Sequence, residues 1–181
     1  DNPAGSPVTV TLSNGASITI AAGASSGTVS MPAPSDDVFI DAGAISVTIA
    51  SASGGNFENL QIDPTAAATS ITDTMDTTTV SLTADATVAE GGNITYTATL
   101  SNVDSLPVGS HGGVTVTLAN GETITIAANA VSGSTSVTVN SDDVLTETDS
   151  ITNSIATVAS VVTGEFESLV KDTGTVTTTI S

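Results

Sequence analysis

The chain has no cysteine and no tryptophan, and its 181 residues include one Lys or Arg and one His. Without Cys there is no disulfide framework, and one His leaves too few ligands for a zinc site. Nineteen acidic residues give a formal net charge of −18, so nucleic acid and anionic membranes are poor partners and we expect neither. Aromatic residues make up only 2% of the chain, which argues against a sugar-binding cleft.

Helical periodicity is also absent, since no segment keeps it for longer than about one turn. Val, Thr, Ser and Gly are abundant, and this composition favours strands. Asn14-Gly15 and Asn120-Gly121 each separate two alternating runs, which is a strong hairpin signal. The sequence therefore predicts an all-β, immunoglobulin-like antiparallel β-sandwich, with Phe57, Tyr96 and Phe166 in the core. Alternation of apolar and polar residues predicts strands over residues 78–84, 93–100, 114–118, 122–128, 134–139, 150–158 and 165–180.

The chain repeats itself at an interval of about a hundred residues. Residues 8–46 align without gaps to residues 114–152 at an offset of 106, with 21 of 39 positions identical. After a three-residue insertion the match resumes at an offset of 109. The matching residues there are Gly55, Phe57, Glu58 and Leu60 in the first copy and Gly164, Phe166, Glu167 and Leu169 in the second. The repeat has the size of one small domain.

The first copy lacks the strands with which the second copy begins, because nothing in residues 1–77 corresponds to residues 78–102. We expect residues 1–77 to form the C-terminal part of one sandwich and residues 78–181 to form a second, nearly complete one. An incomplete sandwich has an unpaired edge, and such edges recruit strands. A second chain, or a cleaved piece of the same array, is therefore expected to complete residues 1–77.

Acidic residues gather at the ends of the two expected domains. They are Asp36, Asp37, Asp41, Asp73 and Asp76 in the first copy and Glu90, Asp142, Asp143 and Glu147 in the second. Crowded carboxylates with no base nearby repel one another, and Ca²⁺ relieves this by accepting about six to eight oxygen ligands. The alternative is that these are solvated loop carboxylates that keep a secreted protein soluble. Glu58 and Glu167 are either solvated strand positions or outer groups of such calcium sites.

Several segments of this chain resemble known repeats. EGG, DDVxxE and an acidic linker together resemble Calx-β sandwiches. VTVTLSNG, SSGTVSMPAPSDDV, SGGNFENL and VAEGGNITYTATLSN are similar to the tandem extender repeats of giant bacterial RTX adhesins secreted by the type I route. The likeness covers essentially all 181 residues. It implies calcium ligands at Glu90, Asp142, Asp143 and Glu147, and in the first copy at Asp36, Asp37, Asp41, Asp73 and Asp76.

The resemblance implies a non-catalytic, calcium-rigidified extender segment of a bacterial cell-surface adhesin. Such a segment projects a ligand-binding tip in adhesion or biofilm formation and has neighbouring repeats of the same chain as partners. An extracellular location without direct membrane contact is expected. The alternative is an adhesive module that itself binds a glycan or another copy.

Catalytic motifs carry little weight in this chain. Residues 23–27 match GxSxG, but no helix is expected after them and the second copy does not keep the pattern. His111 is the only histidine of the chain that could accept a proton from a catalytic serine, and we expect it to be exposed in a Gly-rich loop. We therefore do not expect an enzyme.

Overall fold

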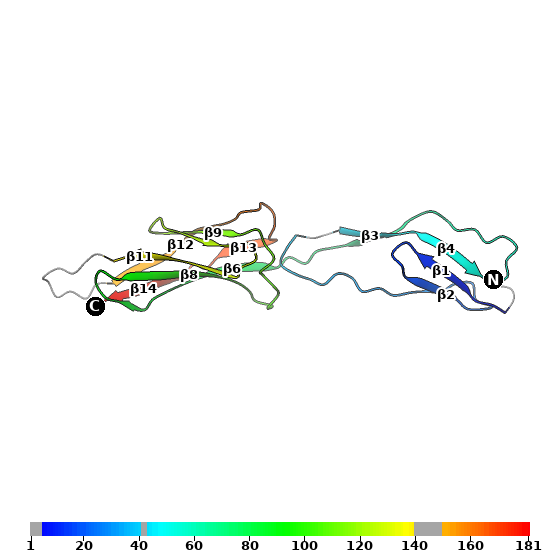
Figure 1. Cartoon of the computed structure of the whole chain (residues 1–181), viewed down its shortest axis with the longest axis horizontal. Coiled ribbons are helices and arrows are strands. Elements are labelled where there is room, and N and C mark those ends of the chain that lie inside the picture. The colour runs from blue at the N-terminus through cyan, green and yellow to red at the C-terminus, as the bar shows by residue number, and fades with distance from the viewer. Residues whose placement is uncertain (1–4, 41–42, 140–149) are drawn as a thin grey trace. The chain divides into compact units, whose positions relative to one another are not determined.

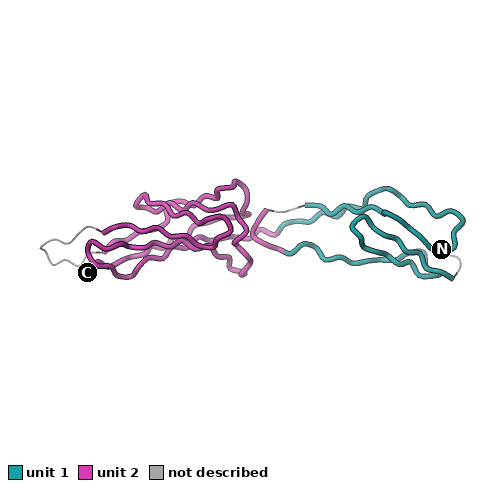
Figure 2. Tube along the Cα trace, in the orientation of Figure 1, with its two compact units in different colours: residues 1–35, 42–73 teal, residues 36–41, 74–181 magenta. Residues whose placement is uncertain are grey.

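The computed structural model describes residues 5–40, 43–139 and 150–181, and it confirms the prediction of an all-β fold. None of the described residues forms a helix long and apolar enough to cross a membrane. The chain divides into two compact units (Figure 2). Unit 1 comprises residues 1–35 and 42–73, and unit 2 comprises residues 36–41 and 74–181. Residues 36–41 therefore belong to unit 2, although they lie between two parts of unit 1 in the chain.

Unit 2 is a β-sandwich of two sheets (Figure 1). One sheet contains, in spatial order, β11 (Ser132–Thr138), β8 (Asn93–Asn102), β6 (Thr77–Ala84) and β13 (Ser168–Lys171). The other contains β10 (Thr123–Ile126), β9 (Val114–Leu118), β12 (Ser150–Ser160), β14 (Thr175–Ile180) and β7 (Thr87–Val88). The hairpin predicted at Asn120-Gly121 joins β9 to β10, with Gly121 at a φ of 90°.

Two strand pairs in unit 2 are parallel, β6 with β13 and β7 with β14, and the other pairs are antiparallel. The run predicted over residues 165–180 is split into β13 and β14, because the chain leaves one sheet and enters the other near Asp172. The Asp172 N–H donates to the carbonyl of Val80, and its carboxylate accepts from the Gly174 N–H. The beginning of the unit crosses from one sheet to the other between β6 and β7, and its end crosses in the same way between β13 and β14.

The core of unit 2 lies between its two sheets. Inward-facing positions alternate along β8, β9 and β10, as period-2 strands require. Tyr96 and Phe166 are buried there, as predicted. Fully burying one Val, Leu or Ile side chain stabilises a fold by about 1.5–3 kcal/mol, so this two-sided core accounts for much of the stability of the unit.

His111 is buried in unit 2, so the prediction of an exposed loop residue is wrong. Its Nε2 lies 2.7 Å from the carbonyl oxygen of Ala130, and its Nδ1 accepts from the Gly113 N–H at 3.0 Å. These partners require a neutral ring that carries its proton on Nε2. The ring also contacts Phe166, with the centroids 5.5 Å apart. His111 therefore joins the loop to the core instead of facing water.

Unit 1 contains a three-stranded sheet and a two-stranded sheet. The first has the order β2 (Ser17–Ile20), β1 (Val8–Leu12), β4 (Ile49–Gly54), and the second pairs β3 (Gly43–Val47) with β5 (Ala67–Ile71). The hairpin predicted at Asn14-Gly15 joins β1 to β2, with Gly15 at a φ of 86°. The pairing of β1 with β4 has the same register as that of β9 with β12, including the bulge. The sheet β2-β1-β4 of unit 1 thus corresponds to strands β10, β9 and β12 of unit 2.

Phe57 is 40% exposed, so the prediction that it lies in a core is wrong, whereas its repeat counterpart Phe166 is 7% exposed. The difference follows from the neighbours of each ring. Phe166 packs against His111 and Phe39. At the position of His111 the first copy has Gly5, which offers no side chain.

The two phenylalanines allow a matched test of this difference. Phe166→Ala is expected to lower the free energy of unfolding of unit 2 by about 3–5 kcal/mol, because it leaves a cavity in a closed core. Phe57→Ala is expected to lower stability by about 1 kcal/mol, since much of that ring already meets water. Urea unfolding of both variants measures the two losses. Equal losses would contradict the assignment of Phe166, and not Phe57, to a closed core.

Candidate functional site

An acidic cluster surrounds the start of β6 in unit 2. Asp76 precedes this strand and shares its inward face with Thr78 and Val80, as the two-residue period of a strand requires. The Asp76 side chain is only 9% exposed. A carboxylate is thus placed where the strand pattern otherwise supplies core residues.

The surroundings of Asp76 disfavour its charged form. Burial raises the pKa of Asp76, and the carboxylates of Asp36 and Asp104 raise it further by repulsion. A hydrogen bond from Asn102 acts in the opposite direction but does not compensate. These surroundings therefore favour the protonated, neutral form of the Asp76 carboxyl.

The hydrogen bonds of the cluster leave one carboxylate oxygen unused. The Asp76 N–H donates to the carboxylate of Glu167. Asn102 donates from Nδ2 to the carbonyl of Thr77 at 3.1 Å, and its Oδ1 accepts from the Asp104 N–H at 2.8 Å. Asp76 Oδ2, together with the buried Thr78 Oγ1, has no hydrogen-bond partner. Such buried oxygens are rare in folded proteins and commonly mark an ion or a water.

Asp36 reaches the cluster because the residues after it are anchored in unit 2. Val38 is fully buried in the core, at 0% exposed. The Phe39 ring lies 5.2 Å from that of Phe166, and the two residues form a β-bridge. The Ile40 N–H donates to the carbonyl of Glu165 at 3.1 Å. We call residues 36–40 the inserted segment.

The structure brings together some of the residues predicted as metal ligands and separates others. Asp36 and Asp76 interact. Asp37 accepts from the Phe39 N–H at 2.8 Å and so shapes its own turn. Asp73 belongs to unit 1, and Glu90 lies in the turn beyond β7, with the whole of β6 between it and Asp76. Asp41, Asp142, Asp143 and Glu147 lie outside the described residues.

Sequence reasoning missed Asn102 and Asp104. Both follow from strand pairing, because Thr78 lies opposite Asn102 in the antiparallel pair of β6 and β8. The alternating pattern identifies both strands, but the register that joins these two ends is not visible in the sequence.

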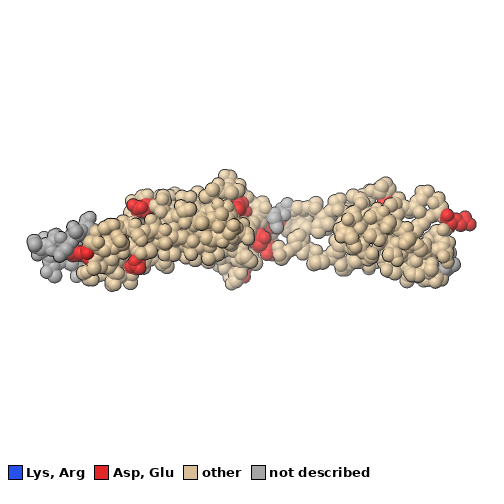
Figure 3. All heavy atoms as spheres, viewed as in Figure 1, with Lys and Arg blue, Asp and Glu red and all other residues tan. Residues whose placement is uncertain are grey.

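The donor types of the cluster fit a hard cation. Carboxylate and amide oxygens are the ligands that Ca²⁺ prefers, and there is no thiolate. No three Asp, Glu or His side chains within the described ranges converge as a ready-made metal site. On the face shown in Figure 3, acidic side chains form small separate groups. The arrangement fits a cation in chemistry, and a full ligand shell is not preformed among these residues.

Asp76→Asn tests the electrostatics of the cluster. Because the folded chain raises the pKa of Asp76 above its ordinary value of 3.8, folding favours the protonated form. The contribution of this group to stability is therefore full below that ordinary value and is lost as pH rises through the raised pKa. Asp76→Asn should remove that loss and raise stability at neutral pH in the presence of a chelator. Urea unfolding between about pH 3 and pH 7 checks this; an unchanged pH profile would contradict it.

Comparison with known proteins places the chain in a family. A family model described as the LapA domain matches residues 1–74 and again residues 76–181. No curated protein matches the chain. LapA is a large adhesion protein, and its family indicates a non-enzymatic role at the cell surface or outside the cell. Since the two matches leave out only Met75, the chain belongs to the LapA domain family and is related to bacterial adhesins.

Proposed function

We propose that this chain is a calcium-stiffened extender segment of a bacterial RTX adhesin, exported by the type I route, that holds a ligand-binding tip away from the cell in adhesion or biofilm formation. The observation that carries the proposal is the inserted segment. Residues 36–41 belong to unit 2 while the residues before and after them belong to unit 1. The chain therefore passes between the two units three times.

Three passages restrain two domains more than one linker does. Domains joined by one flexible linker move independently by default. The inserted segment is fixed by the burial of Val38 and by backbone bonds to Glu165 and Glu167 on both sides of Phe166. An extender needs such restraint, because a freely hinged array would collapse toward the cell surface. Neighbouring repeats are thus the partners that the proposal requires.

Calcium has a specific role in this proposal. Asp36 on the inserted segment and Asp76 at the start of β6 repel each other. A Ca²⁺ that drew the carboxylates of Asp36, Asp76 and Asp104 together around itself would replace this repulsion with attraction to a shared ion. The unpartnered Asp76 Oδ2 supports this, since it is a buried oxygen without another donor. The attraction to the ion and the burial of Val38 would then both hold the inserted segment against unit 2.

The apolar anchor is tested by placing a charge within the inserted segment. Val38→Asp is expected to release the segment, because an unpaired buried carboxylate is strongly unfavourable. Ile40→Asp is the matched control, since Ile40 is 57% exposed. Hydrogen exchange at residues 36–40 and small-angle scattering report release and added flexibility. If both variants behave alike, the inserted segment does not restrain the two units.

Calcium binding is tested by thermal unfolding with and without chelator. At a calcium concentration about 100-fold above Kd, a site present only in the folded chain adds about 2.7 kcal/mol of stability. Asp76→Asn is expected to remove most of this gain. Asp172→Asn is the control, because Asp172 is an exposed carboxylate that accepts only a local backbone bond, from Gly174.

Small-angle scattering completes the calcium test. The wild-type chain should have a larger maximum dimension with calcium than with chelator, and Asp76→Asn should remove the difference. A calcium-induced gain in stability that survives in Asp76→Asn would place the ion elsewhere. An unchanged scattering profile would refute the stiffening role even if calcium binds.

A further inference from the structure

The buried ring of His111 is held in its neutral form by hydrogen bonds on both sides. The side chain is 3% exposed, its Nε2 donates to the carbonyl of Ala130, and its Nδ1 accepts from the Gly113 N–H. A protonated ring carries a hydrogen on both nitrogens. Protonation of Nδ1 would therefore bring two donors face to face and cost the bond from Gly113 without supplying another acceptor.

The backbone around His111 is fixed by bonds to two neighbouring segments. The His111 carbonyl accepts from the Asn129 N–H at 2.9 Å, and the Gly113 carbonyl accepts from the Val161 N–H at 2.9 Å. Gly113 has a φ of 122°, and a Cβ there would lie 3.2 Å from the carbonyl oxygen of Ile126. The Gly113 N–H therefore keeps its direction, so the ring is the part that moves when it gains a proton.

The His111 ring supports the inserted segment through one intermediate side chain. Its centroid lies 5.5 Å from that of Phe166, and the Phe166 ring lies 5.2 Å from that of Phe39 in the inserted segment. The residues on either side of Phe166 make backbone hydrogen bonds to residues 38–40, at 3.1 and 3.2 Å. Displacement of His111 would therefore leave Phe166, and with it the inserted segment, without support on one side.

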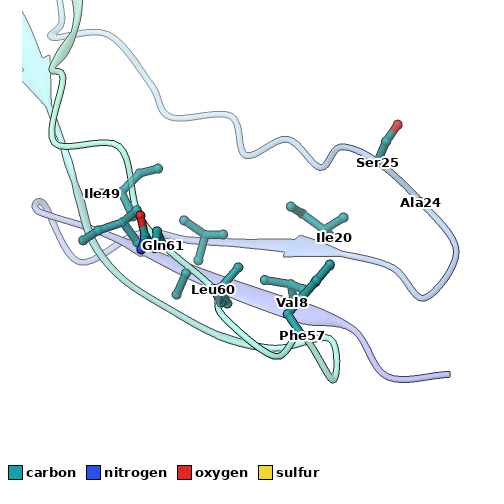
Figure 4. A pocket seen from close by; sticks show the side chains of 11 residues that line it. Val8, Ile20, Ala24, Ser25, Ile49, Phe57, Leu60 and Gln61 are labelled. Carbon is teal, nitrogen blue, oxygen red and sulfur yellow. The ribbon is translucent and has the colours of Figure 1, made fainter. Parts of the chain in front are cut away.

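The first copy has the corresponding phenylalanine without this support. Gly5 stands at the position of His111, and Phe57, the counterpart of Phe166, is 40% exposed. Figure 4 shows Phe57 close to Val8, where both line an apolar groove of unit 1. Because the chain has a single histidine, the contact between a histidine and this phenylalanine is a feature of unit 2.

One carboxylate is bonded to the same loop as His111. Glu165 accepts from the Gly112 N–H through both of its oxygens, at 2.8 and 3.0 Å, and from the Ser160 hydroxyl at 3.3 Å. The nitrogens of the neutral His111 ring already have other partners. A protonated ring is attracted to a carboxylate, but turning toward Glu165 takes it away from Phe166.

The other charged groups around His111 are engaged elsewhere. Glu167 accepts from a backbone N–H at the start of β6. In the inserted segment, Asp36 faces the acidic cluster and Asp37 accepts from the N–H of its own turn. No titratable side chain other than His111 lies in the three remaining neighbouring segments, residues 105–118, 127–131 and 158–161.

We propose that His111 is a proton-operated latch on the inserted segment. The neutral ring holds Phe166 against Phe39, whereas the protonated ring leaves this position, turns toward Glu165 and weakens the hold of unit 2 on residues 36–40. Nothing in this latch requires calcium, so it stands or falls separately from the calcium-stiffened extender. The inserted segment is thus attached at neutral pH and released by mild acid.

The direction of this pH dependence follows from linkage. Attachment requires the neutral ring, whereas the released state accepts either form, so attachment is full well above about pH 6.5, where histidine in water is half protonated. Below that value each pH unit favours release by about tenfold. Asp76 acts in the opposite direction, because burial raises its pKa and the folded chain favours its protonated form.

Nuclear magnetic resonance of the full chain provides the first test, since a single histidine gives unambiguous ring signals. At about pH 7.5 we expect a neutral ring with its proton on Nε2. Between about pH 7.5 and pH 5.5, exchange of the Ile40 and Glu167 amides, corrected for the intrinsic pH dependence of exchange, should become about tenfold faster.

A matched amide and a chelator control this measurement. The Thr179 N–H donates to Ala86, with most of β12 between it and His111, and should keep its corrected rate. All samples contain chelator, so that loss of calcium does not produce the change. The same acceleration in Asp76→Asn would confirm that the acidic cluster is not its source.

Two variants separate a latch from a merely structural role. His111→Gln keeps a donor for Ala130 but does not titrate, so the acceleration at Ile40 and Glu167 should disappear, even where the variant is less stable. Glu165→Gln keeps an acceptor for the Gly112 N–H and removes the charge, so release should require a pH lower by about half a unit or more.

Three results would overturn the proposal. The first is a ring that is charged at about pH 7.5 or carries its proton on Nδ1. The second is exchange at Ile40 and Glu167 that does not respond to pH in the wild-type chain. The third is an acceleration that persists in His111→Gln, which would assign it to another group. If that variant does not fold, His111→Asn, which keeps an acceptor for Gly113, takes its place.

Discussion

A sheet whose residues alternate between apolar and polar must bury one face, and this constraint governs the molecule. Unit 2 meets it with a second sheet, and the residues of β9 and β10 are excluded from water as a result. Unit 1 pairs its strands in the same register, but on the apolar face of that sheet only Val8 and Val10 are buried, and Leu12, Ile18 and Ile20 are partly exposed. Similar local sequences therefore differ in burial according to what packs against them: Val114, Leu118, Ile124 and Ile126 are at most 1% exposed in unit 2.

The inserted segment depends on the same kind of burial. Val38 is fully buried in the core cluster of unit 2. Asp36 lies two residues before this buried side chain, and its carboxylate raises the pKa of Asp76 by repulsion. The only Lys of the chain, Lys171, does not relieve that repulsion, because its ammonium donates to the carbonyl of Ile155. The hydrophobic and electrostatic requirements of the cluster thus oppose each other.

Much of the fold was predictable, and less of the site. Alternation and the Asn-Gly pairs identified the strands and both hairpins, since these signals are local. The burial of His111 and the exposure of Phe57 were missed, because each depends on neighbours distant in the sequence. Asp36 and Asp76 were predicted as site residues. Asn102 was not, because it lies near Asp76 only through the register of β6 with β8. The burial of Val38 in unit 2, between two parts of unit 1 in the chain, also leaves no local pattern in the sequence. Long-range pairing, which a single sequence does not reveal, decides these points.

The parallel pairing of the first and last strands of unit 2 has a mechanical consequence. A tensile load applied at Thr77 and Ile180 would pull β6 and β13 in opposite directions along their common axis. The bonds of this ladder, and those from Asp172 to Val80 and from Thr179 to Ala86, would then carry the force at the same time instead of breaking one after another. Bonds loaded together in shear resist extension better than bonds that are peeled apart one at a time.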